Sequence, residues 1–243
     1  YTIATFATLR CLEQIKLDVC YQNMPVTIVG TGAGLSYSDL GTTHHAIDDI
    51  GILRTIPNLR IFAPCDSNEL SSVLKYINSN PAPTYIRIGK KGEFEMFKKK
   101  PEFSIESGQK IFSGNEIALL SSGTMINRAL EVYKALESLN ISVSLINCAT
   151  IKPIPKLFLQ QILNSHHLVV TFEEHSIIGG FGSAVAEIQA EESTKNKLLK
   201  FGLADTFPKN IGDKEYTLKM FGFSITESIN KIIKMHNAIK TTN

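Results

Sequence analysis

Short apolar runs alternate with segments of helical periodicity along the whole chain. Apolar, β-branched runs predict buried strands, and apolar residues spaced by three and four predict helices. In the first hundred residues the expected strands are 1–6, 26–29, 59–62 and 84–88. The helices expected between them are 9–21, one that starts at the paired His44 and His45, and one that starts after Asp66. Asp66 and Glu69 have the spacing of a capping box, in which the Asp66 side chain accepts from the helix amides and Glu69 reaches back.

The alternation is interrupted once and then resumes. Residues 93–115 are charged, broken by proline and poorly periodic, so we expect them to link two domains. Beyond them the expected strands are 117–120, 141–146 and 168–172, and the expected helices are 125–139, 157–163, one from 184 and 225–239. Alternating strands and helices predict mainly parallel sheets with right-handed crossovers. The predicted fold class is therefore α/β, with two consecutive three-layer αβα domains, residues 1–104 and 105–243.

Composition narrows the classes of function. The chain is 43% hydrophobic and 20% charged, which is typical of a globular protein with buried cores. A net charge of +2 is too small to indicate nucleic acid or an anionic membrane surface as a partner. No apolar run approaches the roughly 18 residues that a membrane-spanning helix needs. The four cysteines show neither CxxC pairing nor a histidine at metal-ligand spacing, so we expect reduced thiols, no metal site in this chain and a cytoplasmic location.

The start of the chain carries an expectation of its own. Tyr1 already belongs to the strand pattern, and no initiator methionine precedes it. The sequence therefore predicts that no signal peptide is present and that the chain begins inside a domain.

Residues 25–64 form the chemical centre of the sequence. A β-branched strand is followed by a loop with four glycines, the two histidines and then Asp48 and Asp49, where a helix dipole favours anions. Open α/β sheets bind ligands at the carboxyl ends of their strands, which is where this loop lies. The pattern indicates a ligand site on the loop.

Four motifs resemble one family. The runs G-T-T-H-H-A-I-D-D-I, L-R-T-I-P-N and A-P-C-D-S-N-E resemble the pyrimidine-binding domain of the transketolase family. The run T-F-E-E-H-S-I-I-G-G-F-G-S-A resembles the carboxy-terminal domain of that family. Its glycines do not form a dinucleotide fingerprint, because the third small residue is replaced by Val185. The resemblance implies that they serve helix–strand packing and a subunit contact, and it leaves the role of His175 open.

The resemblance also implies roles for individual residues. Phe6 and Leu9 would supply apolar surface to the aminopyrimidine ring of thiamine diphosphate. His44 would be catalytic and substrate-binding, near the carbonyl and hydroxyl oxygens of the donor, where an imidazole can exchange protons near neutral pH. Lys90, which with Lys91 follows the strand 84–88, would bind the substrate phosphate as a point charge.

One position departs from the family pattern. Where many transketolases carry an aspartate that contacts the sugar, this chain has Leu40, with Asp39 beside it as the candidate substrate-binding residue. The donor and acceptor sugars therefore stay open.

The chain also lacks parts of the family pattern. No G-D-G motif followed by asparagine is present, and in the family that motif holds Mg²⁺ and the diphosphate. The catalytic glutamate of the family lies upstream of Tyr1. The resemblance therefore implies the carboxy-terminal, pyrimidine-side part of a thiamine-diphosphate-dependent transketolase, which passes a two-carbon ketol unit from a ketose donor to an aldose acceptor. It would be active only with a diphosphate-binding amino-terminal subunit or domain that holds Mg²⁺. The resemblance further implies an α₂β₂-like assembly that acts on small sugar substrates. Whether the chain is a natural split subunit or a fragment is open.

Three other functions remain possible on the sequence alone. The chain could be similar to 1-deoxyxylulose-5-phosphate synthase, or to the β subunit of the E1 component of a 2-oxoacid dehydrogenase. The second histidine and the L-R-T-I-P-N run favour transketolase over both. A third possibility, from another class, is a non-catalytic scaffold subunit that keeps the fold, which would bind no thiamine diphosphate.

Overall fold

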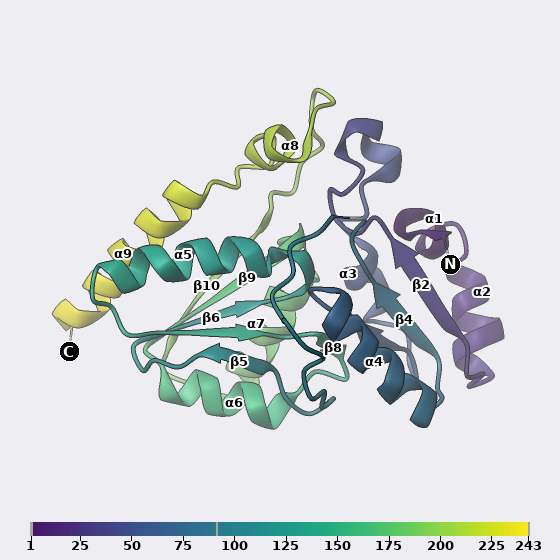
Figure 1. The fold of residues 1–243 in the computed structure, drawn as a ribbon, viewed down its shortest axis with the longest axis horizontal. Coiled ribbons are helices and arrows are strands. Elements are labelled where there is room, and N and C mark those ends of the chain that lie inside the picture. The colour runs from purple at the N-terminus through teal and green to yellow at the C-terminus, as the bar shows by residue number, and fades with distance from the viewer. Residues whose placement is uncertain (1, 91, 243) are drawn as a thin grey trace.

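Two five-stranded sheets, each flanked by helices, make up the protein (Figure 1). The computed structural model describes residues 2–90 and 92–242. In the second half, α5 and α9 pack together on one face of the sheet, and α6 and α7 pack together on the other. The predicted α/β class, with mainly parallel sheets between helical layers, is confirmed. Within the described residues, no helix combines the length and the apolar character that crossing a membrane requires.

The first sheet has the strand order β1-β2-β4-β3-β8. Its strands are β1 (Thr2–Ile3), β2 (Thr27–Thr31), β3 (Arg60–Phe62), β4 (Thr84–Arg87) and β8 (Thr150–Lys152). Its helices are α1 (Ala4–Thr8), α2 (Leu12–Gln14), the π-helical η1 (Ile15–Tyr21), the 3₁₀ turns η2 (Ser38–Leu40) and η3 (Thr42–His44), α3 (Asp49–Leu53) and α4 (Ser67–Ser79). All pairings except that of β8 are parallel, so the carboxyl ends of β1, β2, β3 and β4 share one edge.

The second sheet has the strand order β10-β9-β6-β7-β5. Its strands are β5 (Gln109–Phe112), β6 (Ile117–Ser121), β7 (Val143–Asn147), β9 (Leu168–Ser176) and β10 (Lys197–Leu203). Its helices are the 3₁₀ turn η4 (Gly123–Met125), α5 (Ile126–Ser138), α6 (Lys156–Ser165), α7 (Phe181–Glu192), α8 (Lys214–Met220) and α9 (Ile225–Thr242). Every residue of β6 and β7 is buried, as expected for parallel strands covered by helices on both faces, and most of their side chains are apolar.

Helix α4 begins where the capping pattern predicts. The Asp66 side chain accepts a hydrogen bond from the Glu69 amide at 2.8 Å. Glu69 reaches back one residue further than expected, because its carboxylate accepts from the Cys65 amide at 2.7 Å. Its other oxygen accepts from the Asn147 side chain at the end of β7, also at 2.7 Å. This buried carboxylate therefore ties the start of α4 to the second sheet.

The first two predicted elements of the chain are wrong. The strand expected over 1–6 stops at Ile3, and Phe6 lies in helix α1; Tyr1 lies outside the described residues. Strand β1 stops there because its neighbour β2 ends: Ile3 pairs with Thr31, the last residue of β2, and residues 4–6 have no strand beside them to pair with. The single helix expected over 9–21 is divided between the end of α1, α2 and η1.

The helix expected to start at the histidines begins later. His44 ends the 3₁₀ turn η3, and His45 is extended, with φ −74° and ψ 109°. Helix α3 begins only at Asp49. The intervening residues are held by a backbone bridge between Gly34 and Ala46, which a helix could not form.

The two halves are joined more closely than the sequence suggests. The predicted linker is shorter than 93–115, because Gln109–Phe112 form β5. Strand β8, although it follows β7 in the chain, pairs antiparallel with β3 of the first sheet. One apolar core, which includes Leu53, Ile61, Leu120 and Val169, runs through both halves. The boundary at residue 104 stays a prediction.

Candidate active site

A glycine-rich loop leaves β2 at the carboxyl edge of the first sheet. Gly32 has φ +70°, and a Cβ there would lie 1.9 Å from the Tyr37 ring. Gly34 has φ +61°, and a Cβ there would lie 2.6 Å from the side chain of Glu174. Because side chains rarely adopt this backbone region and no space is left for them, both positions require glycine. The loop therefore folds back tightly and presents Tyr37 and His44 at the sheet edge.

His44 lies among aromatic rings at the end of η3. Its imidazole meets the Phe6 ring with centroids 5.0 Å apart and the Tyr37 ring with centroids 6.4 Å apart. Nδ1 lies 3.0 Å from the Thr43 hydroxyl. Nε2 makes no hydrogen bond to any residue that the structure describes, so it is the nitrogen available to a ligand. The half-buried position gives the imidazole a fixed orientation with one free edge.

Lys90 joins this cluster from the loop after β4. Its ammonium lies 5.6 Å from the centroid of Tyr37, within the range of a cation–π contact. Tyr37 therefore stands between Lys90 and His44, so the structure brings together three residues predicted from the sequence: Phe6, His44 and Lys90. Lys91 lies outside the described residues.

Two further predicted residues lie on the exposed rim. Leu9, the residue after α1, is 42% exposed. Asp39 is exposed in η2, and its carboxylate forms no hydrogen bond or ion pair with the part of the chain that is described. Neither contacts His44 through a ring or a side-chain hydrogen bond, so their ligand roles stay predictions.

Two residues of the cluster were missed by sequence reasoning. Tyr37 is an aromatic residue between the glycines and the histidines, and that position was the available signal. The Arg10 guanidinium lies 4.2 Å from the centroid of the Phe6 ring. Nothing in the local pattern indicates that contact, because a basic residue near a helix end is usually solvated. Arg10 covers one face of the Phe6 ring.

His45 has a structural environment unlike that of its neighbour. It is buried, and its Nε2 lies 3.2 Å from the Ser38 carbonyl oxygen. Its Nδ1 is buried without a hydrogen-bond partner among the described residues. The ring of His45 is therefore held inside the protein, whereas His44 keeps a ring nitrogen without a hydrogen bond to the described residues.

A buried ion pair supports the loop from below. Arg87 at the end of β4 contacts the Asp49 carboxylate at 2.9 Å, and the Tyr85 hydroxyl donates to the same carboxylate at 2.7 Å. Burial acts to lower the pKa of Arg87, but Asp49, Tyr85 and Glu174 together outweigh burial and raise it. Burial, together with Asp49, raises the pKa of Tyr85 well above its usual value. The guanidinium is therefore a permanent charge, and its Nη2 also donates to the Ala46 carbonyl at the base of the loop.

The E-E-H run at the end of β9 meets this network from the second half. Glu173 accepts from the amides of Phe181 and Gly182 at the start of α7, at 2.6 and 2.9 Å. Burial raises the pKa of Glu173 to about 7. A Cβ at Gly180 would lie 2.1 Å from the Glu173 carboxylate, so this glycine serves close helix–strand packing, as the family resemblance implied. The implied subunit contact stays a prediction.

His175 is a packing residue between the halves. Its Nε2 accepts a hydrogen bond from the Gly51 amide in α3, and its Nδ1 lies 2.8 Å from the Ser176 carbonyl oxygen. These partners fix the neutral imidazole with the proton on Nδ1, and burial lowers the pKa of His175. The side chain therefore connects α3 with β9 and contacts neither His44 nor Phe6.

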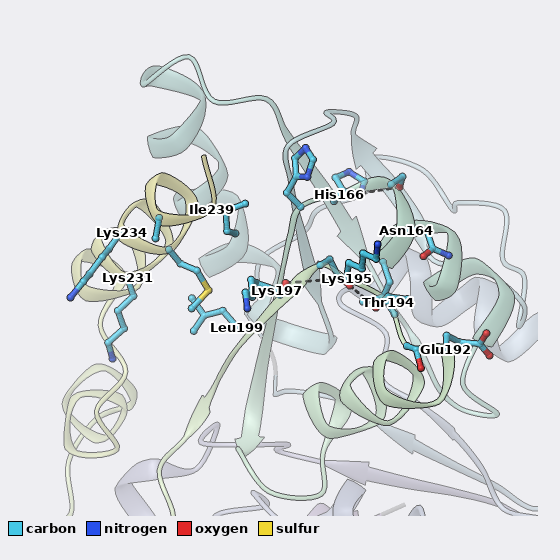
Figure 2. A pocket seen from close by; sticks show the side chains of 17 residues that line it. Asn164, His166, Glu192, Thr194, Lys195, Lys197, Leu199, Lys231, Lys234 and Ile239 are labelled. Carbon is cyan, nitrogen blue, oxygen red and sulfur yellow. Dashed lines mark hydrogen bonds between the residues drawn. The ribbon is translucent and has the colours of Figure 1, made fainter. Parts of the chain in front are cut away.

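Two of the cavities on the described surface bear on the location of the site. One, of about 630 Å³, adjoins the cluster and is lined by Thr31, Tyr37, Lys90 and Thr124 among others. A larger one, of about 1150 Å³, lies at the amino-terminal ends of β9 and β10, the opposite end of β9 from Glu174 (Figure 2). There Lys231 and Lys234 on α9 point away from Lys195, so the lysines do not converge on one point (Figure 2). The smaller cavity is therefore the one that belongs to the candidate site.

The residues present fit one half of thiamine diphosphate. The Phe6 ring and the exposed Leu9 side chain offer apolar surface of the kind that an aminopyrimidine ring needs. Within residues 2–90 and 92–242, no cluster of three or more histidine, cysteine, aspartate or glutamate side chains could hold a metal ion. The site in this chain fits the apolar end of the cofactor, and the location of Mg²⁺ stays a prediction.

Comparison with known proteins identifies the family. The profile described as "Transketolase, pyrimidine binding domain" matches residues 1–92, and "Transketolase, C-terminal domain" matches residues 107–227. The chain belongs to the transketolase family. Its two matched domains correspond to the carboxy-terminal section of a transketolase, as the sequence motifs indicated.

Several relatives cover nearly the whole chain. An apulose-4-phosphate transketolase subunit of Actinobacillus succinogenes is 33% identical over 96% of the chain and 75% of the relative. A putative transketolase C-terminal section of Methanocaldococcus jannaschii is 34% identical over 96% of the chain and 72% of the relative. A solved structure described as a split gene transketolase, inactive β4 tetramer, has a TM-score of 0.84 at 33% identity and covers 96% of the chain and 73% of that chain. A Pichia stipitis transketolase, with a TM-score of 0.76, 18% identity and coverage of 98% of this chain and 34% of its own, shares the fold.

Proposed function

We propose that this chain is the pyrimidine-side subunit of a thiamine-diphosphate-dependent transketolase, which transfers a two-carbon ketol unit from a ketose donor to an aldose acceptor. The observation that carries this proposal is the ring cluster at the carboxyl edge of the first sheet. There Phe6 and Tyr37 flank His44, on the family's histidine motif, beside an exposed lysine. This edge is where α/β sheets bind ligands.

Each residue of the cluster has a distinct role in the proposal. Bound thiamine diphosphate supplies the carbanion stabilisation that ketol transfer needs. Phe6 and Leu9 hold its apolar ring, and His44 accepts and returns a proton of the donor at Nε2, the nitrogen that the protein leaves unbonded among the described residues. Lys90 attracts the phosphate of the sugar, and Asp39 on the exposed rim accepts from a sugar hydroxyl.

The diphosphate-binding partner would cover the amino-terminal segment. Five large apolar side chains are exposed there, which are Leu9, Leu17, Tyr21, Met24 and Val26. Tyr21 is 78% exposed, which is unusually high for a large aromatic side chain in a folded protein, and exposed apolar surface of this kind is typical of a protein–protein contact. We propose that the subunit or domain that holds Mg²⁺ and the diphosphate packs on this surface, next to Phe6, in an α₂β₂-like assembly. On the sequence grounds given above, we place that assembly in the cytoplasm.

Calorimetric titration tests the split-site proposal. The chain alone, and then the chain mixed with the candidate diphosphate-binding partner, is titrated with thiamine diphosphate and Mg²⁺. We expect tight binding and ketol transfer only in the mixture, because the chain supplies apolar surface and no cation site in its described part. Micromolar binding and full turnover by the isolated chain would overturn the proposal. Absence of cofactor binding in the assembled complex would instead favour a scaffold subunit.

A second thiamine-dependent reaction is favoured by specific relatives. The 1-deoxy-D-xylulose-5-phosphate synthase of Chlorobium phaeovibrioides is 39% identical over 82% of this chain, although that match covers 32% of the synthase. Product analysis of the assembled complex with pyruvate or with a ketose as donor separates the two. Ketol transfer from the ketose supports the transketolase, and condensation of pyruvate with an aldehyde phosphate, with loss of the pyruvate carboxyl group as carbon dioxide, supports the synthase.

A further inference from the structure

A carboxylate from the second half of the chain reaches the histidine-bearing loop of the first half. Glu174 near the end of β9 accepts a hydrogen bond from the Leu35 amide at 2.6 Å. The two residues are 139 positions apart in the sequence. The Glu174 side chain is 1% exposed. A charge-assisted bond of this length, shielded from water, is among the stronger contacts available to a loop.

The loop is shaped to receive this carboxylate. At Gly34, a Cβ would lie 2.6 Å from both Cγ and Cδ of Glu174, and 2.7 Å from its Oε1. The glycine is therefore needed for two reasons, its positive φ and the approach of Glu174. Backbone and carboxylate fit each other in a way that a chance surface contact would not require.

The other carboxylate oxygen is anchored in the second half. Glu174 Oε2 accepts from the Thr124 hydroxyl at 2.8 Å and pairs with the Lys214 ammonium at 2.9 Å. Thr124 belongs to the turn after β6, and Lys214 begins α8. The carboxylate is thus held from one side by two side chains of the second half, while its first oxygen reaches the loop.

The contact continues from Leu35 to His44 through backbone hydrogen bonds. Gly34 and Ala46 exchange two bonds of 3.0 Å, which close the loop that contains Tyr37 and His44. Arg87 Nη2 donates at 2.7 Å both to the Ala46 carbonyl and to the Glu174 carbonyl. Both ends of the loop are therefore fastened to the Glu174 position, one through its side chain and one through Arg87.

We infer that Glu174 is a positioning residue, whose carboxylate fixes the glycine-rich loop and so holds His44 against Phe6 in the geometry that proton transfer requires. This inference rests on the proposed function for its consequence in catalysis. It assigns the carboxy-terminal domain a direct part in shaping the site on the pyrimidine-binding domain. A displacement of about 1 Å at a reacting group can cost on the order of a hundredfold in rate.

Three changes separate the loop contact from the ion pair. Glu174→Ala removes both. Lys214→Met removes the ion pair and leaves the Leu35 hydrogen bond. The double variant Glu174→Gln with Lys214→Met keeps an oxygen for the Leu35 amide and an amide donor for Thr124, with no ammonium opposite it. Its close match in shape keeps the test usable where Glu174→Ala does not fold.

Glu173→Gln is the matched control. Glu173 is the adjacent buried glutamate, but its carboxylate bonds the amides of Phe181 and Gly182 within its own half. The Glu173→Gln variant measures how much stability and turnover are lost when any buried carboxylate in β9 is altered. We expect it to lower thermal stability without changing exchange in the loop.

The measurements are turnover of the complex assembled with the diphosphate-binding subunit, and amide hydrogen exchange over residues 32–46. We expect Glu174→Ala to lower kcat tenfold to a hundredfold, with little change in the KM of the acceptor, and to accelerate exchange in the loop. The double variant should recover most of both, and Lys214→Met should leave both close to the parent. The inference is overturned if Glu174→Ala leaves loop exchange unchanged, or if Glu173→Gln at equal loss of stability lowers kcat as much.

Amide hydrogen exchange over residues 32–46 does not depend on turnover, so it tests the role of Glu174 separately from the proposed function. If the assembled parent protein shows no ketol transfer, the proposed function fails. The change in loop exchange between parent and variants still decides whether Glu174 holds the loop.

Discussion

The rings of Phe6 and His44 meet nearly edge to face, with centroids 5.0 Å apart and planes inclined by 65°. Phe6 comes from the first helix, and His44 comes from the end of the glycine-rich loop. This contact joins an apolar surface suited to a cofactor ring with an imidazole suited to proton exchange.

His44→Ala should lower turnover about a hundredfold or more, because a positioned proton-transfer group is lost. Thermal stability should change little, since the side chain is half-buried and its one hydrogen bond is to an exposed threonine. Steady-state kinetics of the assembled complex and a melting curve measure the two effects. His45→Ala is the comparison, and it should cost stability because that ring is buried. An unchanged rate in the His44 variant would exclude its catalytic role.

Lys90→Ala should raise the KM for phosphorylated sugars and leave the KM for unphosphorylated sugars unchanged. The reason is that an exposed ammonium beside the Tyr37 ring attracts a phosphate as a point charge. Kinetics with matched pairs of phosphorylated and free sugars measure the effect, with Lys98→Ala as a control on another exposed lysine. Equal changes for both kinds of substrate would point to a general electrostatic or folding role.

Asp49→Ala should lower the free energy of unfolding by about 3–5 kcal/mol, because it leaves the buried Arg87 guanidinium without its carboxylate. Urea unfolding followed by circular dichroism measures the loss. Lys156→Gln, which breaks two ion pairs on the surface, should change little by comparison. Similar effects of the two substitutions would show that the buried pair does not support the loop.

Glu173 should make the protein less stable as pH rises. Its folded pKa of about 7 lies above the value of about 4.3 expected in the unfolded chain, so the folded state holds the proton more tightly. The stabilisation is complete below about pH 4 and is lost as pH rises to about 7. Urea unfolding at several pH values should show the stability of the parent falling relative to Glu173→Gln across this window. A constant difference between parent and variant would contradict the prediction.

Local patterns were sufficient to predict most of the strands and the position of the histidine loop. Strands β2, β3 and β4 appear where apolar β-branched runs predict them, and α4 begins at the predicted cap. These features depend on neighbours in the sequence, such as the capping contact between Asp66 and Glu69. The glycines marked the loop because positive φ angles demand them.

Contacts between distant segments could not be predicted in this way. The residues 4–6 have strand-like character, but β2 ends at Thr31 and offers them no partner. Tyr37 and Arg10 enter the site through ring contacts that leave no periodic trace. The bond between Glu174 and Leu35 spans the two halves, so only the folded structure reveals it.

Strand β8 crosses from the second half of the chain into the first sheet, so that sheet is complete only when both halves are present. Thr150–Lys152 belongs to the second half in the linear order, yet completes the first sheet beside β3. Without the second half, the first sheet would lose its edge strand β8 and leave β3 unpaired on that side, whereas all five strands of the second sheet come from the second half. A nick in the irregular connection at 98–104 would therefore leave both pieces associated as one particle. The domain boundary in the sequence is therefore not a boundary at which the folded chain separates into two parts.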